Sequence, residues 1–257
     1  MLADTPNVDG STSANRSQPE DLLVRRIGLE QEFFLVDRRG MLSDLADPFL
    51  SQCQEAAQRE GLDPHCFKAE CVKSLVEIAT PPSSGLKDLA DNYLNNLELA
   101  LKVASELGLA VYPLGTYPLP ITPVVSDDPG YMIKARTIGH GRFSHAGRCA
   151  GAHLHLELPA GTVWPDVRAA LDAPLAAQEE LLGLYNLATA LDAALVALTR
   201  ACPFYEGRTG GFAARTVHYR SILGFDSLYA DLQEVGGLRT YASRACNLYQ
   251  RFADRLR

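Results

Sequence analysis

The sequence predicts an α+β fold, because segments with strand periodicity alternate with helical segments and the connections between them are long. Apolar residues keep the strand pattern in some segments and recur at helical spacing in others. The chain has 257 residues, of which 47% are hydrophobic and 21% charged. This ordinary globular composition suits one large domain or two small ones.

The first half of the chain is expected to alternate between strands and helices. Ile27–Val36 forms a strand, and the turn Asp37–Gly40 closes it. A helix follows over about 47–60, where apolar residues fall on one face. A second strand is expected over Cys71–Thr80, where two prolines end it. The helical spacing over Leu86–Leu107 predicts a second helix, which the next glycine caps.

The second half is expected to open with a short strand over Ala110–Thr116, and the proline-rich segment after it is a long ordered loop or lid. A fourth strand is predicted over Cys149–Leu158. An alanine-rich segment over about 165–200 is strongly helical, as one helix or as two pieces that break at a proline. A loop at Gly207–Gly211 and mostly helical structure over 226–257 complete the prediction.

Composition excludes several classes of protein. The net charge of −7 argues against nonspecific binding to nucleic acid or to anionic membranes. The longest uncharged stretch, Leu107–Ser126, contains prolines that forbid a spanning helix, and the N-terminus lacks a signal-peptide pattern. The scattered cysteines predict reduced thiols in a cytoplasmic protein. We expect residues 1–20 to be a disordered tail and 21–257 to form one domain.

Glu30 and Glu32 are two carboxylates in the middle of the apolar first strand. Residues two apart share a strand face, so both side chains point the same way, together with Gly28 and Phe34. Carboxylates at such positions are costly unless a cation or water meets them. This face therefore either binds a cation or is simply exposed to solvent.

His153, His155 and Glu157 share one face of the fourth strand, and leucines occupy the other face. Neutral imidazole is a good metal ligand and a good hydrogen-bond partner for phosphate. The alternative is a half-exposed polar face without a ligand.

Glu77 lies inside the second strand, between two aliphatic residues, where a carboxylate is unexpected. Glu70 precedes it by seven residues, so the two acids could meet only through a bulge or if Glu70 precedes the regular strand. Lys73 shares the face of Glu77, and a structural Lys73–Glu77 ion pair is therefore the alternative to a chemical role.

If these three strands belong to one sheet, their polar faces gather five ionisable side chains into one cluster: Glu30, Glu32, Glu77, His153 and His155. Such a concentration of carboxylates repels itself unless divalent cations neutralise it. Oxygen ligands with a few imidazoles favour Mg²⁺ or Mn²⁺, and Mg²⁺ usually accompanies a phosphate substrate. The residues therefore predict a metal–nucleotide site on an open sheet.

Four sequence motifs, which include the acidic and histidine segments described above, resemble those of the bacterial glutamate–cysteine ligase type 2 family, also called carboxylate–amine ligases. The order and spacing agree over about 27–240. The motifs are Gly28–Asp37, Glu70–Ser74 with Glu77–Pro82, Gly151–His155, and Ala201–Gly207 followed by Gly210–Arg220; Ala201–Gly207 resembles the family's SPFW-x-G segment.

The resemblance implies an antiparallel sheet related to that of glutamine synthetase, with one face open for the active site and helices packed on the other. It also implies that ATP phosphorylates a carboxylate, such as the γ-carboxylate of glutamate, and that an amine, such as that of cysteine, then displaces phosphate.

The resemblance further implies roles for individual residues. Glu30 and Glu32 would hold two different metal ions, and Glu70 and Glu77 would complete one of these sites. His153 would serve the second metal or the nucleotide phosphates.

By the same resemblance, His155 would lie nearby as a catalytic or nucleotide-binding group. Arg220 would be a catalytic group, and Arg148 and Arg215 are further candidates to bind phosphate or a substrate carboxylate. For each arginine the alternative is an ordinary surface or helix-capping charge.

We therefore expect an ATP- and Mg²⁺-dependent carboxylate–amine ligase that acts on small molecules, with glutathione biosynthesis as the implied context. The chain lacks the family's C-terminal part, so it is expected to be a fragment or a natural short form, which a second copy could complete as a homo-oligomer. The alternatives are a non-catalytic nucleotide- or metabolite-binding relative and a single-metal cupin-like enzyme.

Overall fold

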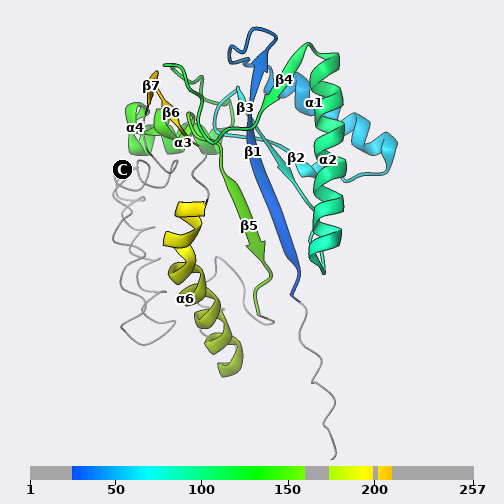
Figure 1. Ribbon diagram of the computed structural model, residues 1–257, viewed down its shortest axis with the longest axis vertical. Coiled ribbons are helices and arrows are strands. Elements are labelled where there is room, and N and C mark those ends of the chain that lie inside the picture. The colour runs from blue at the N-terminus through cyan, green and yellow to red at the C-terminus, as the bar shows by residue number, and fades with distance from the viewer. Residues whose placement is uncertain (1–24, 160–173, 199–201, 210–257) are drawn as a thin grey trace, which may run out of the picture.

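The computed structural model describes residues 25–159, 174–198 and 202–209. Its principal feature is a five-stranded antiparallel sheet with helices packed against it (Figure 1), which confirms the α+β prediction. The elements in chain order are β1 (Ile27–Asp37), α1 (Ala46–Glu60), the 3₁₀ turn η1 (Pro64–Cys66), β2 (Phe67–Ala69), β3 (Leu75–Ala79), α2 (Leu86–Glu106), β4 (Leu109–Tyr112), α3 (Pro129–Ile138), α4 (His140–Ala146), β5 (Ala152–Leu156), α6 (Leu175–Leu198), β6 (Phe204–Tyr205) and β7 (Arg208–Thr209).

Strand β1 is the long centre of the sheet and pairs with three other strands. Its residues 30–34 pair with β3, its residues 34–37 with β4, and its residues 27–31 with β5, all in antiparallel register. Strand β2 adds to the outer side of β3. The three segments predicted to share one sheet therefore do so, with β1 between β3 and β5 (Figure 1).

Helices α1 and α2 cover one face of the sheet. Phe33 and Leu35 of β1 point into this layer and pack on apolar residues of both helices, among them the fully buried Phe49 of α1. The alternation of side chains along β1 sends the residues between them to the opposite face. Burial of this apolar layer stabilises the sheet and fixes which way the acidic residues of β1 point.

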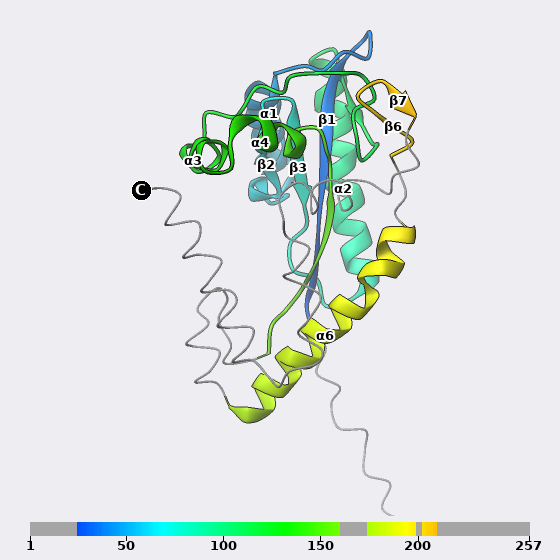
Figure 2. The same ribbon diagram turned by 90° about the vertical axis from the view of Figure 1, so that its left-hand side faces the viewer.

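A second, smaller core covers the upper part of the opposite face. Phe34 and Val36 of β1 pack there with Tyr117 and with residues of α3 and α4, such as Phe143. Figure 2 shows α3 and α4 on one side of β1 and α2 on the other. This face is therefore covered near the C-terminal end of β1, and the acidic residues lie in the part of β1 before that core begins.

The predicted helices over 47–60 and 86–107 are confirmed as α1 and α2. The strand predicted over Cys71–Thr80 is corrected, because residues 71–74 form a turn and only Leu75–Ala79 are a strand. The strands predicted over Ala110–Thr116 and Cys149–Leu158 are likewise shorter, at Leu109–Tyr112 and Ala152–Leu156. Pro113 follows the first of them directly and has no N–H to donate to a strand ladder.

The proline-rich loop is followed by two helices, α3 and α4, that the sequence prediction did not include. In the alanine-rich segment, α6 begins directly after Pro174. Gly207 does not open a loop but forms the turn of the β6–β7 hairpin, with a left-handed φ of 77° that suits glycine. The predictions for residues 1–20 and 226–257 concern parts of the chain outside the described residues. Within the described helices, none is long and apolar enough to cross a membrane.

Candidate metal and nucleotide site

The sheet brings the predicted acidic residues together on one face. In the register of β1 and β3, Glu32 lies opposite Glu77, and in the register of β1 and β5, Glu30 lies opposite His153. Directly opposed residues in a sheet project to the same side. Three segments that are far apart in the sequence therefore aim their ionisable groups at a shared space.

Glu70 reaches this space because it precedes β3 in the turn after β2. Its Oε2 accepts hydrogen bonds from the Cys71 N–H (3.0 Å) and from the Tyr131 hydroxyl of α3 (3.2 Å). Burial, together with the negative charge of Glu32, raises the pKa of Glu70 to about 7. The carboxylates of Glu32, Glu70 and Glu77 are therefore close enough to repel one another, and a bound cation would offset this repulsion.

Two groups of three side chains could each hold a metal ion. We call Glu30, Glu77 and His153 the His153 triad, and Glu32, Glu70 and Glu77 the Glu70 triad. In each triad, the ligand atoms lie within 4.8 Å of one another, and the nearly buried Glu77 belongs to both. Carboxylate oxygens with one imidazole are the donor set that Mg²⁺ and Mn²⁺ prefer, so the residues fit these ions.

Glu32 is held in place by a reciprocal pair of hydrogen bonds with Gly151. The Glu32 N–H donates to the Gly151 carbonyl (2.8 Å), and the Gly151 N–H donates to Oε2 of Glu32 (2.7 Å). The carboxylate is therefore oriented by backbone at the start of β5. Such fixed orientation is what a ligand carboxylate needs in order to present its other oxygen to an ion.

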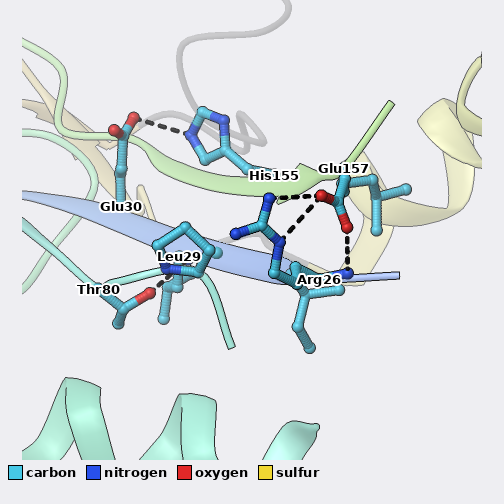
Figure 3. A pocket seen from close by; sticks show the side chains of 10 residues that line it. Arg26, Leu29, Glu30, Thr80, His155 and Glu157 are labelled. Atoms are coloured by element: carbon cyan, nitrogen blue, oxygen red, sulfur yellow. Dashed lines mark hydrogen bonds and ion pairs between the residues drawn. The ribbon is translucent and has the colours of Figure 1, made fainter. Parts of the chain in front are cut away.

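The two histidines of β5 face the acids of β1. Nδ1 of His153 lies 3.9 Å from Oε2 of Glu30, and its Nε2 lies 3.9 Å from Oε1 of Glu32, so this ring stands between both carboxylates. Nε2 of His155 lies 2.8 Å from Oε2 of Glu30 (Figure 3). The structure therefore places His153 between the carboxylates of Glu30 and Glu32, and His155 beside Glu30.

A pocket of about 310 Å³ adjoins Glu30 and His155. Figure 3 shows these two residues at one end of it and the Arg26–Glu157 ion pair at the other. Glu157, predicted to share the face of the histidines, lies just after β5 and binds Arg26. The pocket is of a size that takes a small molecule, and charged groups line it beside the acidic cluster.

Lys68 is a member of the cluster that the sequence prediction missed. Its Nζ lies 2.6 Å from Oε1 of Glu30 and 3.0 Å from Oε1 of Glu77. Burial raises the pKa of Glu30, but the hydrogen bonds from Lys68 and His155 outweigh this and lower it overall. The sequence did contain a signal for this strand, the alternation of apolar Phe67 with charged Lys68. The signal is weak because β2 has only three residues.

The Lys73–Glu77 ion pair, which was the alternative to a chemical role for Glu77, does not form, and the expectation that Lys73 shares the face of Glu77 is wrong. Lys73 lies in the turn before β3, not on the strand, and its Nζ binds Oδ2 of Asp127 at 2.6 Å. The turn breaks the two-residue period from which the shared face was inferred. The lysine that binds Glu77 is Lys68, from the neighbouring strand.

The contacts of Arg148 are with residues outside the two triads. Its guanidinium donates to the Ile121 carbonyl and to the Ser144 hydroxyl and pairs with Glu206 at 3.1 Å. These contacts join the loop before α3 to α4 and to the β6–β7 hairpin. Arg215 and Arg220 lie outside the described residues.

Comparison with known proteins identifies relatives. The chain matches the model of glutamate–cysteine ligase family 2 over residues 26–223. Two Streptomyces proteins with provisional names as glutamate–cysteine ligases are each 25% identical and cover 77% of this chain: ligase 2-1 of S. avermitilis and ligase 2 of S. coelicolor. A Pseudomonas paraeruginosa protein, provisionally named glutamate–cysteine ligase 2, is 28% identical over 74% of the chain. These alignments cover 48%, 47% and 44% of the respective relatives, so the chain spans about half the length of the curated relatives it matches.

Proposed function

The chain belongs to glutamate–cysteine ligase family 2, and from this premise we propose that it is an ATP-dependent carboxylate–amine ligase. Its acid substrate would be glutamate or a similar carboxylate, activated at the γ-carboxylate as an acyl phosphate. The amine substrate would be cysteine or another small amine, which releases phosphate as the amide forms. The implied cofactors are ATP and Mg²⁺ or Mn²⁺.

The observation that carries this proposal is the pair of triads that share Glu77. Phosphoryl transfer from ATP builds negative charge on the transferring group, and positioned cations are the usual means of offsetting it. Strands β1 and β3 are paired and supply Glu30, Glu32 and Glu77, which are all the acids of the two triads except Glu70. Two cations held this way would share the carboxylate of Glu77.

In this proposal the chain's own side chains bind and orient. Glu30, Glu77 and His153 would hold one cation, and Glu32, Glu70 and Glu77 the other. When bound, Mg²⁺ would supply positive charge that offsets the negative charge of the transition state. His155 would hold the carboxylate of Glu30 in position through their 2.8 Å contact.

The pocket beside Glu30 and His155 is the proposed place for the small-molecule substrate. Its volume suits a metabolite of the size of an amino acid. The Arg26 guanidinium lies at the far end of the pocket and pairs with Glu157. Arg26 would bind a substrate carboxylate by giving up Glu157 as its partner. The reacting end of such a substrate would then point toward the triads.

The test is release of ADP from Mg²⁺–ATP in the presence of glutamate and a panel of amines, with the amide identified by mass spectrometry. Turnover that requires acid, amine and Mg²⁺ together would support the proposal. Nucleotide binding without turnover would instead support the non-catalytic relative. The described sheet is open, which disfavours the closed barrel of a cupin-like enzyme.

Two variants make the test specific to the site. Glu32→Gln should abolish binding of Mg²⁺–ATP and leave the fold intact, because it removes a ligand charge without changing side-chain size. Glu60→Gln is the matched control, since Glu60 lies on α1 and pairs with Lys102 away from the triads. Unchanged nucleotide affinity in Glu32→Gln would contradict the proposed site.

A further inference from the structure

Lys68 places a positive charge inside the His153 triad. Its Nζ contacts Oε1 of Glu30 at 2.6 Å and Oε1 of Glu77 at 3.0 Å, and these two carboxylates are the acidic members of that triad. An ammonium at hydrogen-bond distance from both carboxylates neutralises part of the charge that a divalent cation would neutralise.

The backbone fixes this position of Lys68. In the register of β2 and β3, Lys68 lies directly opposite Glu77. The neighbouring Phe67 is buried in the helix-covered core, and its carbonyl accepts a hydrogen bond from Nε2 of Gln54 in α1 (3.0 Å). Because alternate residues of a strand point to opposite faces, Lys68 is directed toward the acids.

A cation in the His153 triad and the ammonium of Lys68 would compete for the carboxylates of Glu30 and Glu77. The ligand atoms of this triad lie within 4.8 Å of one another, so a cation held by them would stand close to the ammonium and be repelled by it. The side chain of Lys68 is 44% exposed, so its flexible stem has a path to withdraw into solvent. Binding of an ion in this triad therefore favours withdrawal of the ammonium.

We propose that Lys68 is a built-in competitor for the divalent cation of the His153 triad. This inference rests on the proposed function, since it takes the triad to be a cation site. Without the ion, Lys68 holds Glu30 and Glu77 together and prevents their mutual repulsion. With the ion, it withdraws, so the affinity of this triad for metal is set lower than its ligands alone would give.

Titration with Mn²⁺ alone, followed by electron paramagnetic resonance, tests the proposal in a background where only the His153 triad is intact. Glu70→Gln provides that background, because Glu70 belongs to the other triad only. Adding Lys68→Met should tighten Mn²⁺ binding by about tenfold or more, since a positive charge in contact with two ligands is removed. Lys68→Gln should do the same and serves as a second variant if the methionine protein folds poorly.

Two controls separate competition from a general effect of charge. Lys68→Arg keeps the positive charge and should leave Mn²⁺ affinity close to that of the Glu70→Gln protein. Lys73→Met removes a lysine whose partner Asp127 is an exposed acid outside both triads, and it should also change little.

Unchanged or weaker Mn²⁺ binding after Lys68→Met and Lys68→Gln would refute the role of Lys68 and leave the metal site standing. A different result would refute both proposals together: no Mn²⁺ binding by the wild-type chain or by any variant, while thermal melts show that all are folded. Tighter binding in the two neutral variants, with the arginine variant unchanged, is the expected outcome.

Discussion

Glu77→Gln is the substitution that should damage the candidate site most. Glu77 supplies a ligand atom to both triads, whereas each of the other members belongs to one. Glutamine keeps the shape of the side chain and removes its charge. The expected result is loss of metal-dependent nucleotide binding with little change in the stability of the metal-free protein.

The magnitude follows from the contacts of Glu77. One charged contact contributes about 1.5–3 kcal/mol, so loss of one in each triad costs about 3–6 kcal/mol. At about 1.4 kcal/mol for each factor of ten, affinity for Mg²⁺–nucleotide should fall by at least about 100-fold.

Stability should respond differently, because two effects oppose each other. The ion pair with the half-exposed Lys68 contributes at most about 1 kcal/mol. Removing a like charge within 4.8 Å of the acids of the Glu70 triad relieves repulsion of at least comparable size. The free energy of unfolding without metal should therefore be unchanged or slightly higher.

The assay is titration calorimetry of a non-hydrolysable ATP analogue with Mg²⁺, with urea unfolding of the same samples without metal. Glu60→Gln should match the wild type in both measurements, since it removes an exposed acid that pairs with Lys102. The reasoning would be refuted by a Glu77→Gln protein that binds the nucleotide with wild-type affinity and the same dependence on Mg²⁺.

Three further outcomes are expected. His153→Ala should reduce ADP release far more than it lowers the melting temperature, because the ring is partly exposed between two ligand carboxylates; full activity would remove it from the site. In the metal-free protein, Glu70 should titrate near pH 7 by NMR, and Glu32→Gln should lower the pKa of Glu70 because it removes a nearby negative charge. Since burial raises the pKa of Glu70 above its value in the unfolded chain, the free energy of unfolding should fall as the pH rises from about 4.5 through 7. Asn96→Ala should cost about 1–3 kcal/mol in urea unfolding, since the buried Asn96 side chain donates to the Ala79 carbonyl (2.8 Å); a loss below about 0.5 kcal/mol would show that water replaces the bond.

The gathering of the acids could be predicted from the sequence because strand periodicity puts them on one face, provided that the three strands share a sheet. Glu30 and Glu32 share a face in any regular strand, and the opposed positions of Glu32 with Glu77 and Glu30 with His153 follow once the strands pair. The sequence left two ways for Glu70 to approach Glu77, a bulge in the strand or a position before the regular strand begins. The structure shows the second, since Glu70 precedes β3.

Lys68 could not be assigned from periodicity, because its partners lie on other strands. The contact with Glu77 depends on the register of β2 with β3, and the five-residue turn over 70–74 sets that register. The same turn removed Lys73 from the strand. Cross-strand partners are decided by such turns, whose conformation the apolar pattern does not encode.

Helix α3 was missed although its start carries a recognisable signal. Asp128 is the N-cap and accepts hydrogen bonds from the N–H groups of Gly130 and Tyr131, and Pro129 occupies the first helical turn. The prolines just upstream dominated the interpretation of the segment as a loop. Without α3, the support that Tyr131 gives to Glu70 could not be foreseen.

The central position of β1 in the sheet has a consequence for how heat or denaturant would affect the candidate site. Glu32–Val36 are buried, and the strand bonds to β3, β4 and β5, so Glu30 and Glu32 cannot be released by fraying at an edge. Their amide hydrogens should exchange only through opening of most of the domain. Heat or denaturant should therefore abolish cation binding and melt the sheet at one midpoint, rather than inactivate the protein first and unfold it later.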